Sequence, residues 1–163
     1  MRRIFGHLIS EIAKRDKKIV LVVGDIGFSI FDEFRKNHPK NFFNLGICEQ
    51  SIISFASGLA LEGLKPWVYT ITPFLIERPF EQIKLDINQQ KPNVKLVGFA
   101  DYPSLGPSHS EIDAKKTMNH FKNIKSYFPQ NSKETKKFFH KCYNQNGPCF
   151  ISLKTDKTIK KRF

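Results

Sequence analysis

The chain has 163 residues, of which 40% are hydrophobic, and its 27 Lys and Arg against 15 Asp and Glu give a net charge of +12. This length is sufficient to bury the core of one domain. Because no apolar run approaches about 18 residues and the opening Met1-Arg2-Arg3 is polar, we expect neither a transmembrane helix nor a secretory signal. The composition therefore argues against a chain that crosses a membrane as a helix, and the cytoplasm is the expected compartment.

Helical and strand patterns alternate along the chain. Residues 18–24 form a continuous apolar run, which is typical of a strand buried on both faces. Gly63 is expected to end the third helix. The predicted helices cover residues 2–15, 30–37, 49–62, 75–89, 111–121 and 132–143. The predicted strands cover residues 18–24, 42–45, 67–71, 94–99, 124–126 and 149–153.

Strands that alternate with helices imply parallel βαβ units. The expected fold is therefore α/β, an open, mostly parallel six-stranded sheet with helices on both faces. No internal repeat or low-complexity linker interrupts the pattern. We expect one domain over residues 1–154, followed by a basic tail over residues 155–163 that is frayed or docked on a partner.

The positive charge is concentrated in the last third of the chain. Residues 1–114 hold 14 basic and 13 acidic side chains, whereas residues 115–163 hold 13 and 2. Lysines alternate with apolar residues at helical spacing over residues 133–142, which indicates a solvated face or a surface for an acidic partner. Aromatic residues nearby leave nucleic-acid binding as a less favoured alternative.

The number and spacing of the cysteines argue against a disulfide framework and against a zinc site. Cys48, Cys142 and Cys149 are odd in number and show no paired spacing. We therefore expect three reduced thiols and no metal site formed by them.

The run Phe42-Phe43-Asn44-Leu45-Gly46-Ile47-Cys48-Glu49-Gln50 delivers a carboxylate to the junction between a predicted strand and a predicted helix. Ligands of open α/β sheets bind outside the carboxyl ends of the strands, so Glu49 lies where chemistry can occur. An acid in the first turn of a helix is also favoured by the helix dipole, so a purely structural role is the alternative.

Four ordered motifs resemble the pyrimidine-binding domain of transketolase. They are Gly46-Ile47-Cys48-Glu49-Gln50, Ala56-Ser57-Gly58-Leu59-Ala60-Leu61-Glu62-Gly63, Pro73-Phe74-Leu75 and Leu105-Gly106-Pro107-Ser108-His109, and the likeness extends over residues 4–154. The resemblance implies the thiamine diphosphate-binding fold of the pyrimidine type. It assigns Glu49 the hydrogen bond to the pyrimidine ring nitrogen that promotes the imino tautomer and so assists proton removal from the thiazolium C2.

The resemblance also assigns residues that hold the cofactor. Phe74 and Phe80 match two aromatic positions that stack on the pyrimidine, while Glu77 stands where a third aromatic is common. Asp25 matches an aspartate that faces the cofactor. A plain core role for Phe80 is an equal alternative.

Further matches concern the substrate. Ser29 corresponds to a serine that reaches a sugar phosphate, and His109 to a histidine that contacts substrate oxygens. Ser108 replaces the family's threonine, and Leu105 replaces an aspartate that precedes the glycine in many transketolases, so donor stereochemistry does not transfer. Lys154, after the last predicted strand, matches a basic residue near the substrate phosphate.

The likeness includes neither the diphosphate and magnesium domain nor the family's C-terminal domain. Ile26 replaces the glycine of a Gly-Asp-Gly metal motif, so we expect no metal ligand in this chain and Mg²⁺ on a partner chain. The resulting interpretation is the pyrimidine-binding subunit of a split transketolase-like enzyme, which transfers a two-carbon ketol unit between sugars that are phosphorylated or nucleotide-linked. Two-fold symmetry in the family implies a homodimer within an A2B2 complex.

Two alternatives remain open at this point. One is a subunit of another thiamine diphosphate enzyme, of the 2-oxo acid dehydrogenase or deoxyxylulose phosphate synthase type. The other is a non-catalytic binding or regulatory module that uses its basic last third. The presence of Asp25, Glu49 and His109 together favours an enzyme over the second alternative.

Overall fold

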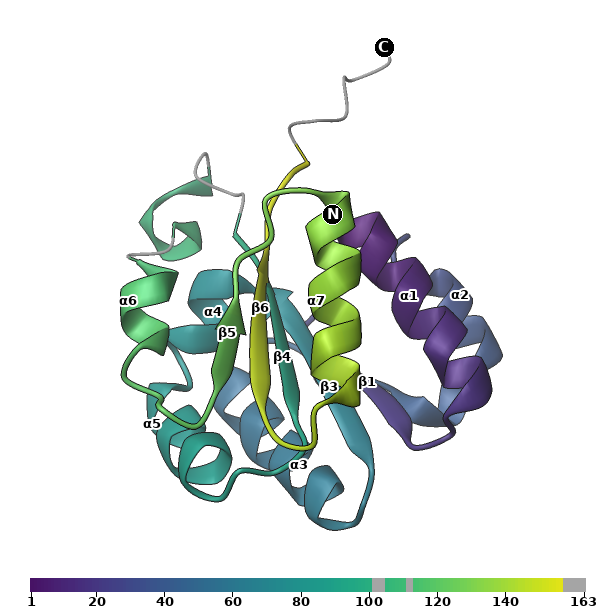
Figure 1. Ribbon diagram of the computed structural model, residues 1–163, viewed down its shortest axis with the longest axis horizontal. Helices are drawn as coiled ribbons and strands as arrows, with labels where there is room; N and C mark the ends of the chain where they lie inside the picture. The colour runs from purple at the N-terminus through teal and green to yellow at the C-terminus, as the bar shows by residue number, and fades with distance from the viewer. Residues whose placement is uncertain (101–104, 111–112, 157–163) are drawn as a thin grey trace.

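The computed structural model describes residues 1–100, 105–110 and 113–156. Six strands form one sheet in the order β2-β1-β3-β4-β6-β5, and every neighbouring pair is parallel (Figure 1). This confirms the six-stranded α/β fold predicted from the alternating pattern. The strands are β1 (Ile19–Val23), β2 (Phe42–Asn44), β3 (Lys65–Ile71), β4 (Lys95–Phe99), β5 (Lys125–Tyr127) and β6 (Cys149–Leu153).

Helices cover both faces of the sheet (Figure 1). On one face α1, α2 and α7 pack over a core that includes Phe5, Trp67 and Phe139, and on the other α3, α4 and α6 pack over Val68 and Leu96. Neighbouring residues of β3 therefore point to opposite cores, as the two-residue period of a strand requires. The helices are α1 (Arg2–Arg15), α2 (Asp32–Asn37), α3 (Glu49–Leu61), α4 (Thr72–Ile76), α5 (Phe80–Gln82), α6 (Ala114–Met118) and α7 (Ser132–Asn144).

Short helical turns complete the connections: η1 (Pro39–Asn41), the π-helix η2 (Ile83–Gln89) and η4 (Pro107–His109). Within the described residues, no helix has both the length and the apolar character needed to cross a membrane.

The helix predicted over residues 75–89 is not continuous. It is divided into α4, α5 and η2, with Glu77, Arg78 and Pro79 in a turn between the first two. Proline lacks the backbone N–H that a helical residue donates, and its ring clashes with the preceding turn. Pro79 therefore interrupts the helix. The break leaves Arg78 in a turn, where its side chain is free to reach a neighbouring helix.

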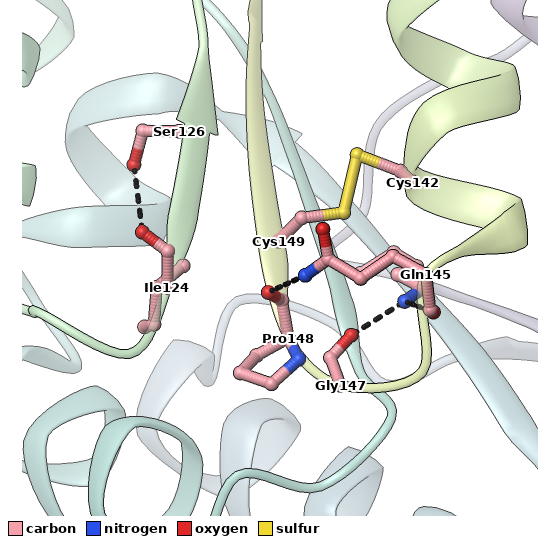
Figure 2. Close-up of a disulfide and its surroundings, with 8 residues drawn as sticks. Ile124, Ser126, Cys142, Gln145, Gly147, Pro148 and Cys149 are labelled. Atoms are coloured by element: carbon pink, nitrogen blue, oxygen red, sulfur yellow. Dashed lines mark hydrogen bonds between the residues drawn. A yellow bond between two sulfur atoms is a disulfide. The ribbon is translucent and has the colours of Figure 1, made fainter.

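The prediction of three reduced thiols is wrong for two of the cysteines. Cys142 in α7 and Cys149 in β6 form a disulfide, with their Cα atoms 6.0 Å apart (Figure 2). The reason is the tight reversal between α7 and β6, in which the Gln145 amide donates to the Pro148 carbonyl (2.8 Å). A spacing of seven residues gives no hint of this reversal. Cys48 keeps a free thiol, which donates to the Leu45 carbonyl (3.0 Å).

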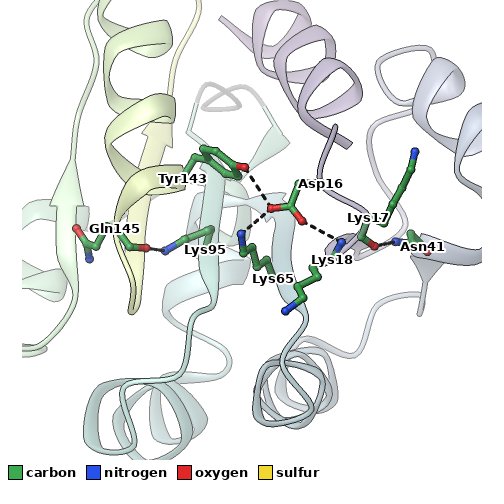
Figure 3. Close-up of polar contacts among 8 residues, drawn as sticks. All are labelled: Asp16, Lys17, Lys18, Asn41, Lys65, Lys95, Tyr143 and Gln145. Carbon is green, nitrogen blue, oxygen red and sulfur yellow. Dashed lines mark hydrogen bonds and ion pairs between the residues drawn. The ribbon is translucent and has the colours of Figure 1, made fainter. Parts of the chain in front are cut away.

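A buried lysine of the sheet also stabilises this reversal between α7 and β6. Lys95 begins β4, is 2% exposed, and its Nζ donates to the carbonyls of Gln145 (2.8 Å) and Gly147 (2.5 Å). Figure 3 shows it beside Lys65, whose own Nζ pairs with Asp16 (2.6 Å). Burial, and behind it the charge of Lys65, lowers the pKa of Lys95 to about 7.

This pKa predicts a specific dependence of stability on pH. An unfolded lysine titrates near 10.4, so between about pH 7 and pH 10 the unfolded chain binds more protons at Lys95 than the folded chain does. The free energy of unfolding should therefore rise with pH across this window, by up to about 1.4 kcal/mol per pH unit from this group.

Lys95→Met removes the titrating group and keeps the side-chain length. We expect urea unfolding of wild type and Lys95→Met, compared at pH 7, 8 and 9, to show a difference in free energy that grows with pH in favour of the wild type. The other titrating groups are common to both chains and cancel in this difference. Parallel pH profiles for the two chains would contradict the assignment.

Candidate active site

The residues predicted to carry function follow the carboxyl ends of the strands. Because all six strands are parallel, their carboxyl ends lie together at one end of the sheet, which we call the ligand edge. Asp25 follows β1, Glu49 follows β2, Phe74 follows β3, His109 follows β4 and Lys154 follows β6. The fold thus gathers segments far apart in the sequence at a single edge.

Glu49 begins α3 and is 5% exposed. The helix dipole favours a negative charge at this position. Helix α3 is anchored at its middle to η2, because the Ser54 hydroxyl donates to the Asp86 carboxylate (2.6 Å) and the Ser57 hydroxyl to the Asp86 carbonyl (3.2 Å). These contacts fix the helix that presents the Glu49 carboxylate.

Arg78 is the partner of Glu49, and the sequence did not identify it. Its Nη1 donates to Glu49 Oε1 at 2.8 Å, and its guanidinium carbon lies 3.5 Å from the centre of the Phe74 ring. Arg78 occupies the turn that Pro79 creates between α4 and α5. The arginine thus ties the carboxylate of one strand-to-helix junction to the ring of the next.

Oxygen Oε2 of Glu49 accepts no hydrogen bond from any described residue. The nearly buried carboxylate therefore has one oxygen fixed by a cation, while the other has no hydrogen-bond partner among the described residues. A hydrogen-bond donor on a flat ring would satisfy that oxygen and could pack against the aromatic surface beside it.

His109 joins the same group through Phe74. The two ring centres are 4.8 Å apart in an edge-to-face arrangement, and the Ser108 hydroxyl lies 3.1 Å from His109 Nδ1. The histidine is half-buried in η4, directly after the Gly106-Pro107 turn. The structure therefore connects Glu49 to Phe74 through Arg78, and Phe74 in turn to His109.

Asp25 and Ser29 lie in a loop that Asn44 organises. Asn44 Oδ1 accepts from the backbone N–H groups of both Asp25 (3.0 Å) and Gly46 (3.1 Å), which links the β1 loop to the segment leading into Glu49. Asp25 and Ser29 are exposed and adopt positive φ values of 51° and 63°. Non-glycine residues in this conformation carry strain that concentrates at functional loops.

Two further predicted residues lie outside this central group. Phe80 is 39% exposed and packs on Phe121, with ring centres 4.9 Å apart, and also near His120. Lys154 is exposed directly after β6. Their assigned contacts with cofactor and substrate stay predictions.

Large apolar side chains around this edge face solvent. Phe28 is 69% exposed, Ile47 71% and Leu105 55%. They flank Asp25, Glu49 and His109 in the sequence. Contiguous exposed apolar surface is typical of an interface, so these three side chains are candidates for contact with another surface.

Comparison with known proteins finds one matching family and several similar proteins. Residues 1–159 match the family described as "Transketolase, pyrimidine binding domain". The chain is 37% identical over 123 residues to an apulose-4-phosphate transketolase subunit of Actinobacillus succinogenes, covering 74% of this chain and 40% of that protein. It is 31% identical over 153 residues to the "1-deoxy-D-xylulose-5-phosphate synthase" of Syntrophomonas wolfei, covering 91% of this chain and 24% of that protein.

Solved structures agree on the fold. A structure titled "Split gene transketolase, inactive beta4 tetramer" superposes with a TM-score of 0.85 at 28% identity, covering 99% of this chain and 54% of that one. The transketolase of Campylobacter jejuni superposes with a TM-score of 0.81 at 20% identity, covering 94% of this chain and 25% of that one. The chain thus spans about half or less of the length of these proteins.

Proposed function

The chain belongs to the transketolase pyrimidine-binding domain family, and from this premise we propose that it is the pyrimidine-binding subunit of a split, thiamine diphosphate-dependent transketolase. The reaction would transfer a two-carbon ketol unit between sugars that are phosphorylated or nucleotide-linked. We place the enzyme in the cytoplasm.

The group formed by Glu49, Arg78 and Phe74 carries the proposal. It combines a nearly buried carboxylate with one open oxygen and an adjacent aromatic ring at the ligand-binding edge of the sheet. An aminopyrimidine is a flat ring with nitrogen atoms that hydrogen-bond to a carboxyl group, so these residues fit the pyrimidine half of thiamine diphosphate. The name of the Actinobacillus relative, a transketolase subunit, supports the split arrangement.

Thiamine diphosphate supplies, in enzymes of this kind, the nucleophilic carbon to which the ketol fragment is transferred. Glu49 contributes acid–base assistance through Oε2, because Oε1 is held by Arg78. Arg78 keeps the carboxylate in one orientation and packs on Phe74, so the ring and the acid are held as a unit. Phe74 and Phe80 supply apolar surface that keeps water from the pyrimidine.

The remaining residues are assigned to substrate and cofactor positioning. His109 contacts substrate oxygens and shares their protons, and its place against Phe74 puts it beside the acid–base group. Asp25 faces the cofactor, while Ser29 and Lys154 bind a substrate phosphate. Lysine suits this role because its ammonium group is a compact positive charge with three donors.

The proposal also includes the magnesium ion and the diphosphate of the cofactor. Among the described residues, no three His, Cys, Asp or Glu side chains are grouped as metal ligands. We assign Mg²⁺ and the diphosphate to a partner chain that packs against the rim of Phe28, Ile47 and Leu105. Two copies of each chain would form an A2B2 assembly with two equivalent sites.

A second candidate has specific support. The Syntrophomonas relative is a deoxyxylulose phosphate synthase, an enzyme that is also thiamine-dependent in this family, and it matches across 91% of the chain. Glu49, Phe74 and Arg78 would serve such an enzyme equally. The two functions differ in their donor, which is a ketose in one case and a 2-oxo acid in the other.

Reconstitution would test the proposal. The chain alone should bind thiamine diphosphate weakly in calorimetry and show no ketol transfer, while mixing it with the diphosphate-domain subunit, Mg²⁺ and cofactor should restore transfer from a ketose phosphate. A coupled assay measures transfer of the two-carbon unit to an aldose acceptor, and light scattering gives the mass of the complex. Activity with pyruvate but not with any ketose phosphate would favour the second candidate, and tight cofactor binding by the chain alone would contradict the split site.

A further inference from the structure

Helix α7 exposes a row of lysines on its outer face. Lys133, Lys137 and Lys141 are all exposed and are spaced four residues apart, so they lie one above another along the helix. At a rise of about 1.5 Å per residue, the row spans about 12 Å. Lys136 and His140 form an exposed second row beside it.

A shallow hollow of about 520 Å³ lies between this helix and the edge strand β5. Its lining includes Lys125, Lys137, His140, Lys141 and Asn144, and it contains no carboxylate. Figure 1 shows α7 and β5 on the same side of the molecule, flanking β6. We refer to α7 from Lys133 to Lys141 together with Lys125 as the basic face.

Within the described ranges, no carboxylate pairs with the lysines of the basic face. The two acids of residues 115–163 both serve the start of α7: Glu134 accepts from the Gln130 backbone N–H (2.8 Å), and Asp156 accepts from the backbone N–H (2.7 Å) and hydroxyl of Ser132. Among the described residues, none forms an ion pair with the following lysines: Lys122, Lys125, Lys133, Lys136, Lys137 and Lys141.

Two half-buried aromatic residues beside this face pack on each other. Tyr127 stacks on Phe138 with ring centres 4.8 Å apart and planes at 21°, and the Lys137 ammonium lies 5.9 Å from the Phe138 ring centre. Binding of single-stranded nucleic acid depends on bases stacking on open aromatic faces, and the mutual stack of Tyr127 and Phe138 occupies one face of each ring. Carboxylates and phosphates can both pair with these lysines. An acidic protein segment needs no aromatic contact, so it fits a face whose rings stack on each other better than a single-stranded nucleic acid does.

We propose that the basic face is a docking surface for an acidic segment of another protein, and that the hollow in this face is separate from the site formed by Glu49 and His109. Lys125 begins β5 and Lys141 lies in the last turn of α7, so the hollow lies toward the amino ends of the strands, whereas Glu49 and His109 follow their carboxyl ends. The hollow therefore lies away from Glu49 and His109, whereas the lysine row extends through Lys133 to the start of α7, where Ser132 donates to Asp156 after β6. This inference goes beyond the proposed function and does not depend on it.

The test uses the full chain and poly-L-glutamate as the acidic probe, with binding followed by calorimetry at about 50 mM and about 300 mM NaCl, where charge screening differs strongly. The variant carries Lys133→Gln, Lys137→Gln and Lys141→Gln. The matched control carries Lys18→Gln, Lys36→Gln and Lys40→Gln, which removes the same charge from exposed lysines near β1 and α2. Circular dichroism verifies that both variants are folded.

We expect the basic-face variant to bind poly-L-glutamate at least about tenfold more weakly than wild type at low salt, and the control to bind within about twofold of wild type. Equal losses in both variants would overturn the proposal, because they would show a response to net charge alone. Absence of wild-type binding at low salt would also overturn it. Tighter binding of polyuridylate RNA than of poly-L-glutamate, lost in the same variant, would replace it with a nucleic-acid surface.

Discussion

Glu49→Gln should lower ketol transfer by the reconstituted complex at least about 100-fold, the scale on which acid–base assistance is lost. Glutamine keeps the size of the side chain and its oxygen can still accept from Arg78, so the geometry of α3 and of the 77–79 turn should persist. What disappears is the carboxyl group that exchanges a proton at Oε2. The measurement is the steady-state rate with a ketose phosphate donor and an aldose acceptor.

Glu62→Gln is the matched control for this variant. Glu62 lies at the other end of the same helix and is exposed, so its change removes one carboxylate near α3 without touching the ligand edge. It should leave the rate within about twofold of wild type, as expected for an exposed surface position. Near-normal turnover of Glu49→Gln would show that Glu49 serves only to begin its helix.

Elements with strong hydrophobic patterns could be predicted from the sequence. The run over residues 18–24 became β1, which is buried at every position, and the helical pattern over residues 132–143 became α7 almost without change. These segments are determined by local periodicity, because a strand or helix buried in the core must present its apolar residues at the matching period. The parallel sheet then places Asp25, Glu49 and His109 at one edge without further information.

The site's central contact could not be predicted in the same way. Arg78 reaches Glu49 across 29 residues, and it does so only because Pro79 interrupts the expected helix. A helix pattern over residues 75–89 gives no sign that the interruption turns a cation toward a carboxylate. The signal that was available is the Glu77-Arg78-Pro79 sequence itself, a charged pair directly before a proline, which favours a helix boundary.

The Cys142–Cys149 disulfide and the burial of Lys95 could not be predicted from the sequence either. Cys142 and Cys149 come together only through the reversal of residues 145–148, and Lys95 is buried only because the carbonyls of that reversal accept its hydrogen bonds. Both depend on the conformation of a short loop, which hydrophobic periodicity does not describe. The sequence predicts free thiols at positions 142 and 149 and gives no sign that the lysine at position 95 is buried, because tertiary contacts determine both.

Arg78→Met should lower activity of the reconstituted complex by about tenfold and weaken its affinity for thiamine diphosphate. Methionine keeps an unbranched apolar stem against Phe74 but has no donor for Glu49 Oε1, so a nearly buried carboxylate loses its cation partner. Because Arg78 itself is 38% exposed, solvent screens part of the loss, and an effect of about tenfold is the appropriate scale. Calorimetry on the assembled complex gives the affinity independently of turnover.

Arg78→Lys separates charge from shape, since lysine keeps the cation but lacks the planar group that stacks on the ring and fits the carboxylate. If Arg78 positions Glu49 through both contacts, Arg78→Lys should lie between wild type and Arg78→Met in both rate and affinity. Arg35→Met is the control, because Arg35 is an exposed arginine whose ion pair with Asp32 (3.4 Å) lies on α2. A loss of activity in Arg78→Met that matches its loss of thermal stability, with unchanged cofactor affinity, would contradict a positioning role and leave Arg78 as a structural residue of the 77–79 turn.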